Sequence, residues 1–342
     1  MVILDLILRA KKRIEEISQT ENISGIPSGF LDLDKLTSGW QSGDLISIGG
    51  RSGMGKTSFA LSMSKNIAVD HNIPLAYFSI ESSSKVTVNK LISAETGLSI
   101  KKLRTGNLET HEWEQLSVKV ESLENAPFFI YDTPALSIES LEIKVAELVE
   151  EHNIKIIIID YLQLMTISNK NSIAANREQH ISIIVKRLKY IARTNGIVVL
   201  VLSQLSRAIE TRGGSKRPIL IDFRESGAIE DDSDIVGFLY RPEYYRIEEW
   251  DDEERTSTHN QGELIIAKNR NGSLQNIRLK FISSIGKFDN LDKSDFFTDY
   301  QADGNSFKKN PFAKENLPSA DDAFGSSMSS SPDLDEDNDV PF

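Results

Sequence analysis

Short apolar segments alternate with amphipathic ones between residues 44 and 281. The apolar segments are rich in Ile, Val and Leu and lack strict two-residue alternation, which is typical of parallel strands buried on both faces. We predict such strands at 44–48, 75–80, 128–131, 155–159, 197–203 and 235–240. The segments between them have helical periodicity, and we predict helices near 56–69, 84–95, 110–123, 138–152 and 177–194.

This alternation predicts an α/β fold with a mostly parallel sheet that helices cover on both faces. Two further apolar segments, 262–268 and 275–281, are joined through Asn271 and Gly272, a pair typical of tight hairpin turns. We therefore expect a β-hairpin at the end of the domain. No internal repeat is evident.

The two ends of the chain differ from this central part. Residues 3–18 carry apolar residues at helical spacing, which predicts an amphipathic helix, and Gly25 and Pro27 mark a linker after it. The helix either packs on its own domain or docks on a neighbouring subunit. Beyond about residue 288 the apolar periodicity fades into Ser, Asp, Pro and Asn, which predicts a disordered tail. The expected divisions are 1–19, 20–29, 30–288 and 289–342.

Composition excludes several classes of protein. The chain has no Cys, its five His show no paired spacing, and no apolar run approaches the ~20 residues of a membrane span, so we expect no disulfide, no zinc site and no membrane. The N-terminus lacks the order of a signal peptide, which favours a cytoplasmic protein. The net charge is −12, but residues 301–342, with nine acidic residues and three Lys, carry −6 of it. Nucleic-acid binding is therefore not excluded, because it depends on local charge.

The sequence GRSGMGKT begins at Gly50, directly after a predicted strand and before a predicted helix. This spacing is typical of a P-loop, in which glycines let successive N–H groups surround phosphate oxygens. We predict ATP or GTP binding with Mg²⁺. Lys56 is expected to reach the β- and γ-phosphates and Thr57 to ligate the metal. The remaining predicted contacts are made by Gly53, Met54, Gly55 and Ser58.

Three polar residues follow predicted strands whose carboxyl ends should meet at one edge of the sheet. Asp160 is expected in the Mg²⁺ shell, because ligands bind at that edge in open α/β sheets. Glu81 can orient and deprotonate the attacking water, and Gln204 can sense the γ-phosphate. Taken alone, Glu81 and Gln204 fit ordinary surface positions equally well.

Taken together, these residues resemble the DnaB family of replicative helicases, specifically its C-terminal RecA-like motor domain. The match follows family order and covers roughly residues 1–285. Its segments are GRSGMGKTSFA from Gly50, YFSIE from Tyr77, IIIIDYLQLM from Ile156, LSQLSR from Leu202, FRESGAIEDDSDI from Phe223 and IIAKNRNG from Ile265. The P-loop is shared by many NTPases, whereas the last two segments are much more specific.

The resemblance implies a homohexameric, ATP-driven helicase that moves 5′ to 3′ along single-stranded DNA at the replication fork. Glu81 is similar to the catalytic base, Asp160 to the Mg²⁺-associated acid and Gln204 to the γ-phosphate sensor. Arg270 matches an arginine finger, with Lys268 as its companion, both directed into the ATP site of the next subunit. Lys90 stands where relatives often carry a nucleotide-contacting Arg, and a Lys there loses the bidentate geometry.

DNA contacts are also implied by the resemblance. Arg224, Glu225 and Gly227 match a central-channel loop, in which Arg224 pairs with a phosphate and Gly227 allows close approach of the backbone. A second channel loop is expected within 168–177. No aromatic platform for base stacking is evident in either loop, so we expect contacts to the DNA backbone.

The chain departs from the family at both ends. The helical N-terminal collar is not present, so we expect a shortened form of the helicase in which primase binding is not to be assumed; a helicase loader is an expected partner. The last ten residues resemble the acidic tip of bacterial single-stranded DNA-binding proteins. In that comparison Asp339, Pro341 and Phe342 would dock on a basic pocket of a partner, the alternative being a solubilising tail.

Two other functions stay open at this point. One is a RecA-like recombinase or regulatory ATPase that does not unwind DNA. The other is an inactive binding module whose tail recruits partners. The sequence does not determine the polarity of movement, the preferred NTP, the loader, or whether rings form without the collar. The bacterial nucleoid or a phage-infected cell is the expected location.

Overall fold

The computed structural model describes residues 3–18, 23–168, 176–213, 216–223 and 227–291. Its nine-stranded sheet has the order β3-β2-β4-β5-β1-β6-β7-β8-β9. The first six strands in this order are parallel, and the last three pair antiparallel. The strands are β1 Leu45–Gly50, β2 Leu75–Ser79, β3 Phe128–Tyr131, β4 Ile156–Asp160, β5 Val198–Gln204, β6 Ile235–Tyr240, β7 Gln261–Asn269, β8 Asn276–Ile282 and β9 Lys287–Asn290.

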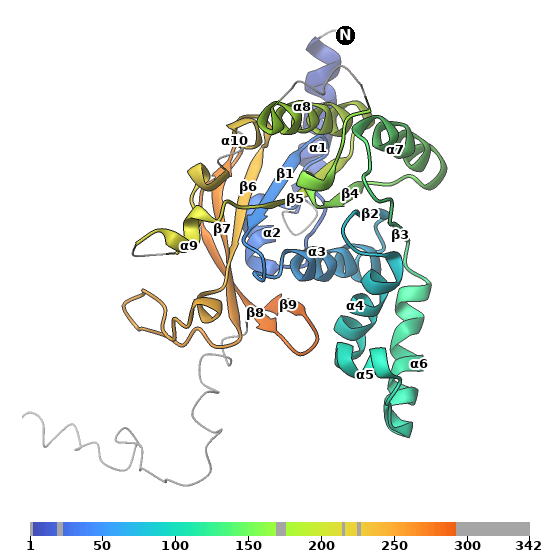
Figure 1. The fold of residues 1–342 in the computed structure, drawn as a ribbon. Coiled ribbons are helices and arrows are strands. Elements are labelled where there is room, and N and C mark those ends of the chain that lie inside the picture. Colours follow the sequence, from blue (N-terminus) through green and yellow to red (C-terminus); the bar gives the residue numbers. More distant parts are fainter. Residues whose placement is uncertain (1–2, 19–22, 169–175, 214–215, 224–226, 292–342) are drawn as a thin grey trace, which may run out of the picture. The chain divides into compact units, whose positions relative to one another are not determined.

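Helices separate the parallel strands along the chain (Figure 1). The five helices predicted between the strands, the helix predicted over 3–18 and all six predicted parallel strands are confirmed, with ends that differ by a few residues at most. The α-helices are α1 Ile3–Ser18, α2 Leu31–Thr37, α3 Lys56–Lys65, α4 Ser84–Thr96, α5 Ile100–Thr105, α6 Thr110–Glu124, α7 Ile138–His152, α8 Arg177–Asn195, α9 Ala208–Thr211 and α10 Gly227–Asp232. Helix α3 continues as one π-helical turn over Asn66–Asp70.

Alternate residues of each central strand face opposite sides of the sheet. In β2, Leu75 and Tyr77 pack in the apolar cluster that includes Phe59 of α3. Ala76 and Phe78 pack in the other cluster, which includes residues of α7 and α8 such as Leu141 and Leu188. Helices therefore cover both faces, as predicted, and this explains why the strands are apolar on both sides.

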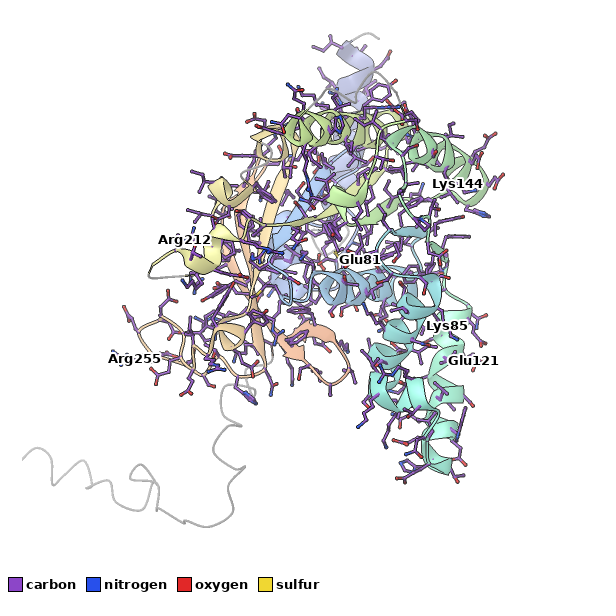
Figure 2. The ribbon with its side chains drawn as sticks, viewed as in Figure 1. Glu81, Lys85, Glu121, Lys144, Arg212 and Arg255 are labelled. Carbon is purple, nitrogen blue, oxygen red and sulfur yellow. The ribbon has the colours of Figure 1, made fainter. Side chains whose placement is uncertain are left out.

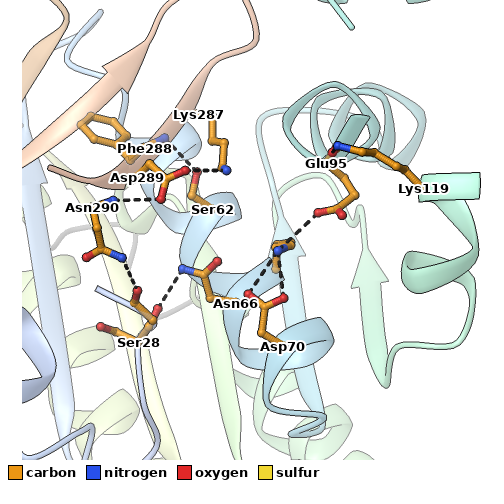
Figure 3. A network of polar contacts seen from close by, with 12 residues as sticks. Ser28, Ser62, Asn66, Asp70, Glu95, Lys119, Lys287, Phe288, Asp289 and Asn290 are labelled. Carbon is orange, nitrogen blue, oxygen red and sulfur yellow. Dashed lines mark hydrogen bonds and ion pairs between the residues drawn. The ribbon is translucent and has the colours of Figure 1, made fainter. Parts of the chain in front are cut away.

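The predicted terminal hairpin is present as β7 and β8, but a third strand, β9, was not predicted. It returns antiparallel to β8 and packs on α3. The Phe288 N–H donates to Ser62 Oγ at 3.0 Å, and Asn290 Nδ2 donates to the Gly29 carbonyl at 3.0 Å, contacts that Figure 3 shows beside α3. The sequence KFDN has little apolar pattern, so the strand depends on these long-range contacts.

The segment before α2 is tied to the same helix. Asn66 Nδ2 donates to the Ser28 carbonyl at 3.3 Å (Figure 3). The buried Asp34 accepts the N–H groups of Ser28 at 2.7 Å and Gly29 at 3.0 Å. Helix α3 is thus held from two sides, and its N-terminus is the end that meets the phosphate-binding sequence.

Candidate functional site

The P-loop sequence joins the end of β1 to the start of α3. Gly53 and Gly55 have φ angles of 83° and 87°, in the left-handed region that a side chain disfavours. A Cβ atom on Gly53 would also lie 2.7 Å from the ring of Tyr244. These glycines let the loop curve tightly into the N-terminus of α3, whose N–H groups and helix dipole favour an anion.

Lys56 is the first residue of α3, and its amine points back into the loop. Nζ donates to the carbonyls of Gly50 at 2.9 Å and Arg51 at 3.2 Å. Burial lowers the pKa of Lys56 from 10.5 to about 8, against the opposing influence of Asp160 and Glu81. The positively charged amine therefore lies in the middle of the loop, where the oxygens of a bound phosphate would accept its hydrogen bonds.

Asp160 ends β4 beside the P-loop helix. Its Oδ2 accepts the Thr57 hydroxyl at 2.8 Å and the Tyr77 hydroxyl at 2.8 Å. The carboxylate is 4% exposed. A Thr hydroxyl next to a carboxylate supplies hard oxygen ligands that suit Mg²⁺ together with phosphate and water. These two residues fit the cation.

Tyr77 was not predicted from the sequence as part of this site. It lies in β2, is fully buried, and its pKa is raised well above 10 by burial and by the neighbouring Asp160 carboxylate. The phenol therefore stays protonated and donates to Asp160. The available signal was a Tyr in a strand buried on both faces, because a buried phenol needs a hydrogen-bond partner.

Glu81 and Gln204 line the same cavity as the P-loop. Figure 2 shows Glu81 next to α3, and Gln204 ends β5 in register with Gly50. The cavity is about 350 Å³ in volume. Its lining consists of Ser52, Gly53, Gly55, Lys56, Thr57, Ser58, Glu81, Asp160, Tyr161, Gln204, Phe281, Ser283 and Gly286. The last three residues, from the β8–β9 hairpin, form a wall that sequence reasoning missed because β9 was missed.

Gln163 holds Gln204 in place through its side-chain amide. Its Oε1 accepts the Gln204 N–H at 3.0 Å, and its Nε2 donates to Ser203 Oγ at 2.8 Å and to the Gln204 carbonyl at 3.3 Å. The backbone pairing of β4 with β5 ends at Ile159 and Val201. The amide thus continues the connection between the two strand ends beyond the last paired residues.

Lys268 and Arg270 lie at the opposite edge of the sheet. Ile235, the first residue of β6, pairs with Asn269 on one side and with Ile46 on the other. The P-loop begins at Gly50, four residues along β1 from Ile46, which is about 13 Å of strand. Neither basic residue is among those that line the cavity of its own chain.

The other predicted site residues have varied positions. Ser58 lines the cavity. Met54 is buried and packs in the core, and Lys90 is half-buried on α4 and is not part of the cavity lining. Gly227 begins α10. The remaining predictions lie outside the described residues: Arg224, Glu225, residues 169–175 of the second loop, and Asp339, Pro341 and Phe342 of the tail.

A second cavity, of about 340 Å³, adjoins Gln204. It is lined by Arg177, which ends the second predicted DNA loop, and by Phe223, which directly precedes Arg224. The structure therefore brings the described ends of the two predicted loops together. Within the described residues no group of His, Cys, Asp and Glu suits a metal, and none of the helices is long and apolar enough to cross a membrane.

Comparison with known proteins identifies relatives over most of the chain. The family model for the DnaB-like helicase C terminal domain matches residues 25–290. The chain is 41% identical over 292 residues to the replicative DNA helicase DnaB of Geobacillus stearothermophilus, covering 85% of this chain and 62% of that protein. It is 44% identical over 286 residues to a probable replicative DNA helicase of Trieres chinensis, covering 83% of this chain and 61% of that one.

Solved structures that are similar to this chain include helicase relatives as well. One of them, an ATPase domain, is 34% identical with a TM-score of 0.77, over 85% of this chain and 99% of that one. A DnaB-like replicative helicase studied with primase is 34% identical with a TM-score of 0.74, over 85% of this chain and 67% of that one. The chain spans about three fifths of the length of the curated relatives.

The lowered pKa of Lys56 predicts pH-dependent nucleotide affinity. Below its pKa of about 8 the amine is charged, and as the pH rises past that value the charge is lost. We expect the affinity for Mg-ATP, measured with a fluorescent analogue, to fall by up to about tenfold between pH 7 and pH 9. Lys56→Arg is the control, because its charge persists throughout this range. An equal decline in the Arg variant would show that another group titrates.

Proposed function

Since the chain belongs to the family of DnaB-like helicase C-terminal domains, as its sequence motifs predicted, we propose that it is the ATP-hydrolysing motor of a replicative DNA helicase. The RecA-like α/β fold expected for that family is confirmed. The single observation that carries the proposal is the separation of Arg270 from the phosphate cradle of its own chain.

The nucleotide is ATP with Mg²⁺. In this proposal the P-loop N–H groups and Lys56 hold the β- and γ-phosphates, and Thr57 and Asp160 hold the metal. Mg²⁺, when bound, neutralises charge on the phosphate oxygens. Phe281 and Gly286 in the cavity wall would meet the part of the nucleotide farther from the reacting phosphate.

Hydrolysis needs a base near the attacking water. Glu81 is exposed at the cavity and close enough to influence the pKa of Lys56. A carboxylate there can orient the water and accept its proton. Gln204, held by Gln163, can hydrogen-bond the γ-phosphate and change partner when that phosphate leaves. The second cavity begins at Gln204, which supports a route from the phosphate to the DNA loops.

The remaining charge must come from a second subunit. Within one chain, the cradle lies four residue steps along β1, from Ile46 to Gly50, from the edge where Lys268 and Arg270 lie. A guanidinium that reaches the γ-phosphate of a neighbour stabilises transition-state charge and is worth ~10³–10⁵ in rate. We therefore propose a closed homohexamer in which each interface completes one ATP site, with the exposed apolar residues of α1 docking on a neighbour.

Single-stranded DNA is the nucleic acid along which we propose that the motor moves. The two predicted loops have their described ends at one cavity, which supports a shared DNA-binding surface. Gly227, at the start of α10, permits close backbone approach, and Arg224 and Glu225 stay predictions from the sequence. Contacts of this kind bind phosphates without reading bases, as a translocating motor requires. A loader, 5′ to 3′ movement and a partner for the tail tip also stay predictions.

Mixed subunits test the shared site. Arg270→Ala should bind ATP normally and lose hydrolysis by at least ~10³-fold, because only the transition state loses its counter-charge. Glu81→Ala should likewise be inactive. Mixing the two variants should restore ATPase activity, since some interfaces then pair an intact Glu81 with an intact Arg270. If no mixing ratio restores ATPase activity although both variants are present in the same oligomers, that result would contradict the action of Arg270 between subunits.

A forked DNA substrate separates helicase activity from the alternative of a RecA-like recombinase. We expect ATP-dependent strand separation of a fork with a single-stranded 5′ tail, and no strand exchange between homologous duplexes. Lys56→Ala is the control, because it removes the charge that the phosphates need. Strand exchange without unwinding would support the recombinase, and ATP turnover that ignores DNA would support a regulatory ATPase.

A further inference from the structure

The side chains of Lys268 and Arg270 are held at one end of α10. Lys268 Nζ donates to the carbonyls of Glu230 and, at 3.2 Å, of Asp231. Arg270 NH2 donates to the Asp231 carbonyl, and its NH1 donates to Asp234 Oδ1 at 3.2 Å. Carbonyls at a helix C-terminus carry partial negative charge and attract cations. Both proposed finger residues are thus fixed by their own chain.

Asp234 stands out among these partners because it is buried. It is 5% exposed, whereas the Arg270 side chain is 44% exposed. Its Oδ2 accepts hydrogen bonds from the Leu45 N–H, at 2.8 Å, and from the Lys189 amine. Its Oδ1 accepts a hydrogen bond from Arg270 NH1. The Arg270 N–H also donates to the Asp234 carbonyl at 2.9 Å. One carboxylate therefore connects the exposed guanidinium to the first residue of β1.

The strength of this connection follows from its surroundings. A buried carboxylate must be paired, and its ion pairs are screened less than those at the surface. Lys189 is itself fixed, because its amine also donates to the Gly43 carbonyl at 2.8 Å. Oδ1 then lies at a defined point of the rigid sheet. An Arg side chain has several rotatable bonds, so such an anchor removes orientational freedom before the reaction.

We propose that Asp234 is a positioning residue for Arg270, aiming the guanidinium at the ATP site of the adjacent subunit. The two contacts from NH1 and NH2 need only two of the five guanidinium N–H donors, which leaves donors for phosphate oxygens. Asp234 is not among the residues that line the phosphate cavity of its own chain. The proposal rests on the action of Arg270 between subunits that is proposed above.

Asp234→Asn tests this role, because the amide oxygen can still accept a hydrogen bond but loses the charge that orients Arg270. We expect kcat for ATP hydrolysis to fall by about 10- to 100-fold, as for other supporting residues of catalytic groups, with the KM for ATP changed less than about twofold. Asp234→Asn should add little to the defect of Arg270→Ala in the double variant. Asp44→Asn is the matched control.

Asp44 is a suitable control because it is a neighbouring carboxylate near the same cations. Burial, and then repulsion from Asp234, raises its pKa to about 6, so it is largely ionised at pH 7.5. Asn at this position removes the same charge without removing the Asp234–Arg270 ion pair. We expect its kcat to stay within about twofold of the parent chain.

The mixing pattern distinguishes positioning from a purely structural role. Asp234→Asn subunits have an intact cradle and Glu81, so mixing with Glu81→Ala subunits should restore activity, whereas mixing with Arg270→Ala subunits should not. A structural defect would instead impair the cradle of the same subunit, and no partner would rescue it. Should Asp234→Asn fail to fold, Asp234→Ser, whose hydroxyl can accept the Leu45 N–H, takes its place in the same mixtures.

Two results would overturn the proposal. One is an unchanged kcat in the folded Asp234 variant, and the other is a defect that Glu81→Ala subunits do not rescue although they rescue Arg270→Ala. The failure of the shared site itself would look different, because Arg270→Ala and Glu81→Ala would then not complement each other either.

Discussion

A β-strand keeps its two ends apart, and in this chain β1 has a phosphate cradle at one end and is linked to a guanidinium at the other. The cradle follows Gly50, and Arg270 is anchored beside Leu45 through Asp234. Side-chain rotation alone does not bring the two together within a chain, since β1 is paired on both sides and keeps Ile46 and Gly50 about 13 Å apart. If Arg270 supplies charge to ATP, a second subunit must bring it.

The rest of the structure makes each half of the site rigid. The parallel strands place Asp160 and Gln204 at one edge, next to Lys56, and helix α3 is held there by β9 and by the segment before α2. At the other edge, α10 and Asp234 hold the basic residues of the hairpin. The contacts described for each half are made within one chain. In the proposed assembly, the partner would complete the charge balance of the transition state.

Much of this site was predictable because the positions of its residues follow from short sequence patterns and from the ends of predicted strands. Gly53 and Gly55 serve a loop that their spacing specifies, and Glu81, Asp160 and Gln204 follow strands whose carboxyl ends must share an edge. The misses have a common cause. Tyr77 and Asp234 act through partners more than 30 residues away. Phe281 lines the cavity from β8, where it pairs with Phe288 of the short β9. Pairing register decides such contacts, and local pattern does not report it.

The dependence of ATP turnover on assembly tests this account most directly. The measurement is the hydrolysis rate per subunit across a dilution series with single-stranded oligonucleotide, with the oligomer mass determined at each concentration. If two chains share each site, the rate per subunit should fall steeply as oligomers dissociate and vanish in the monomer. A constant rate per subunit down to fully dissociated chains would contradict it.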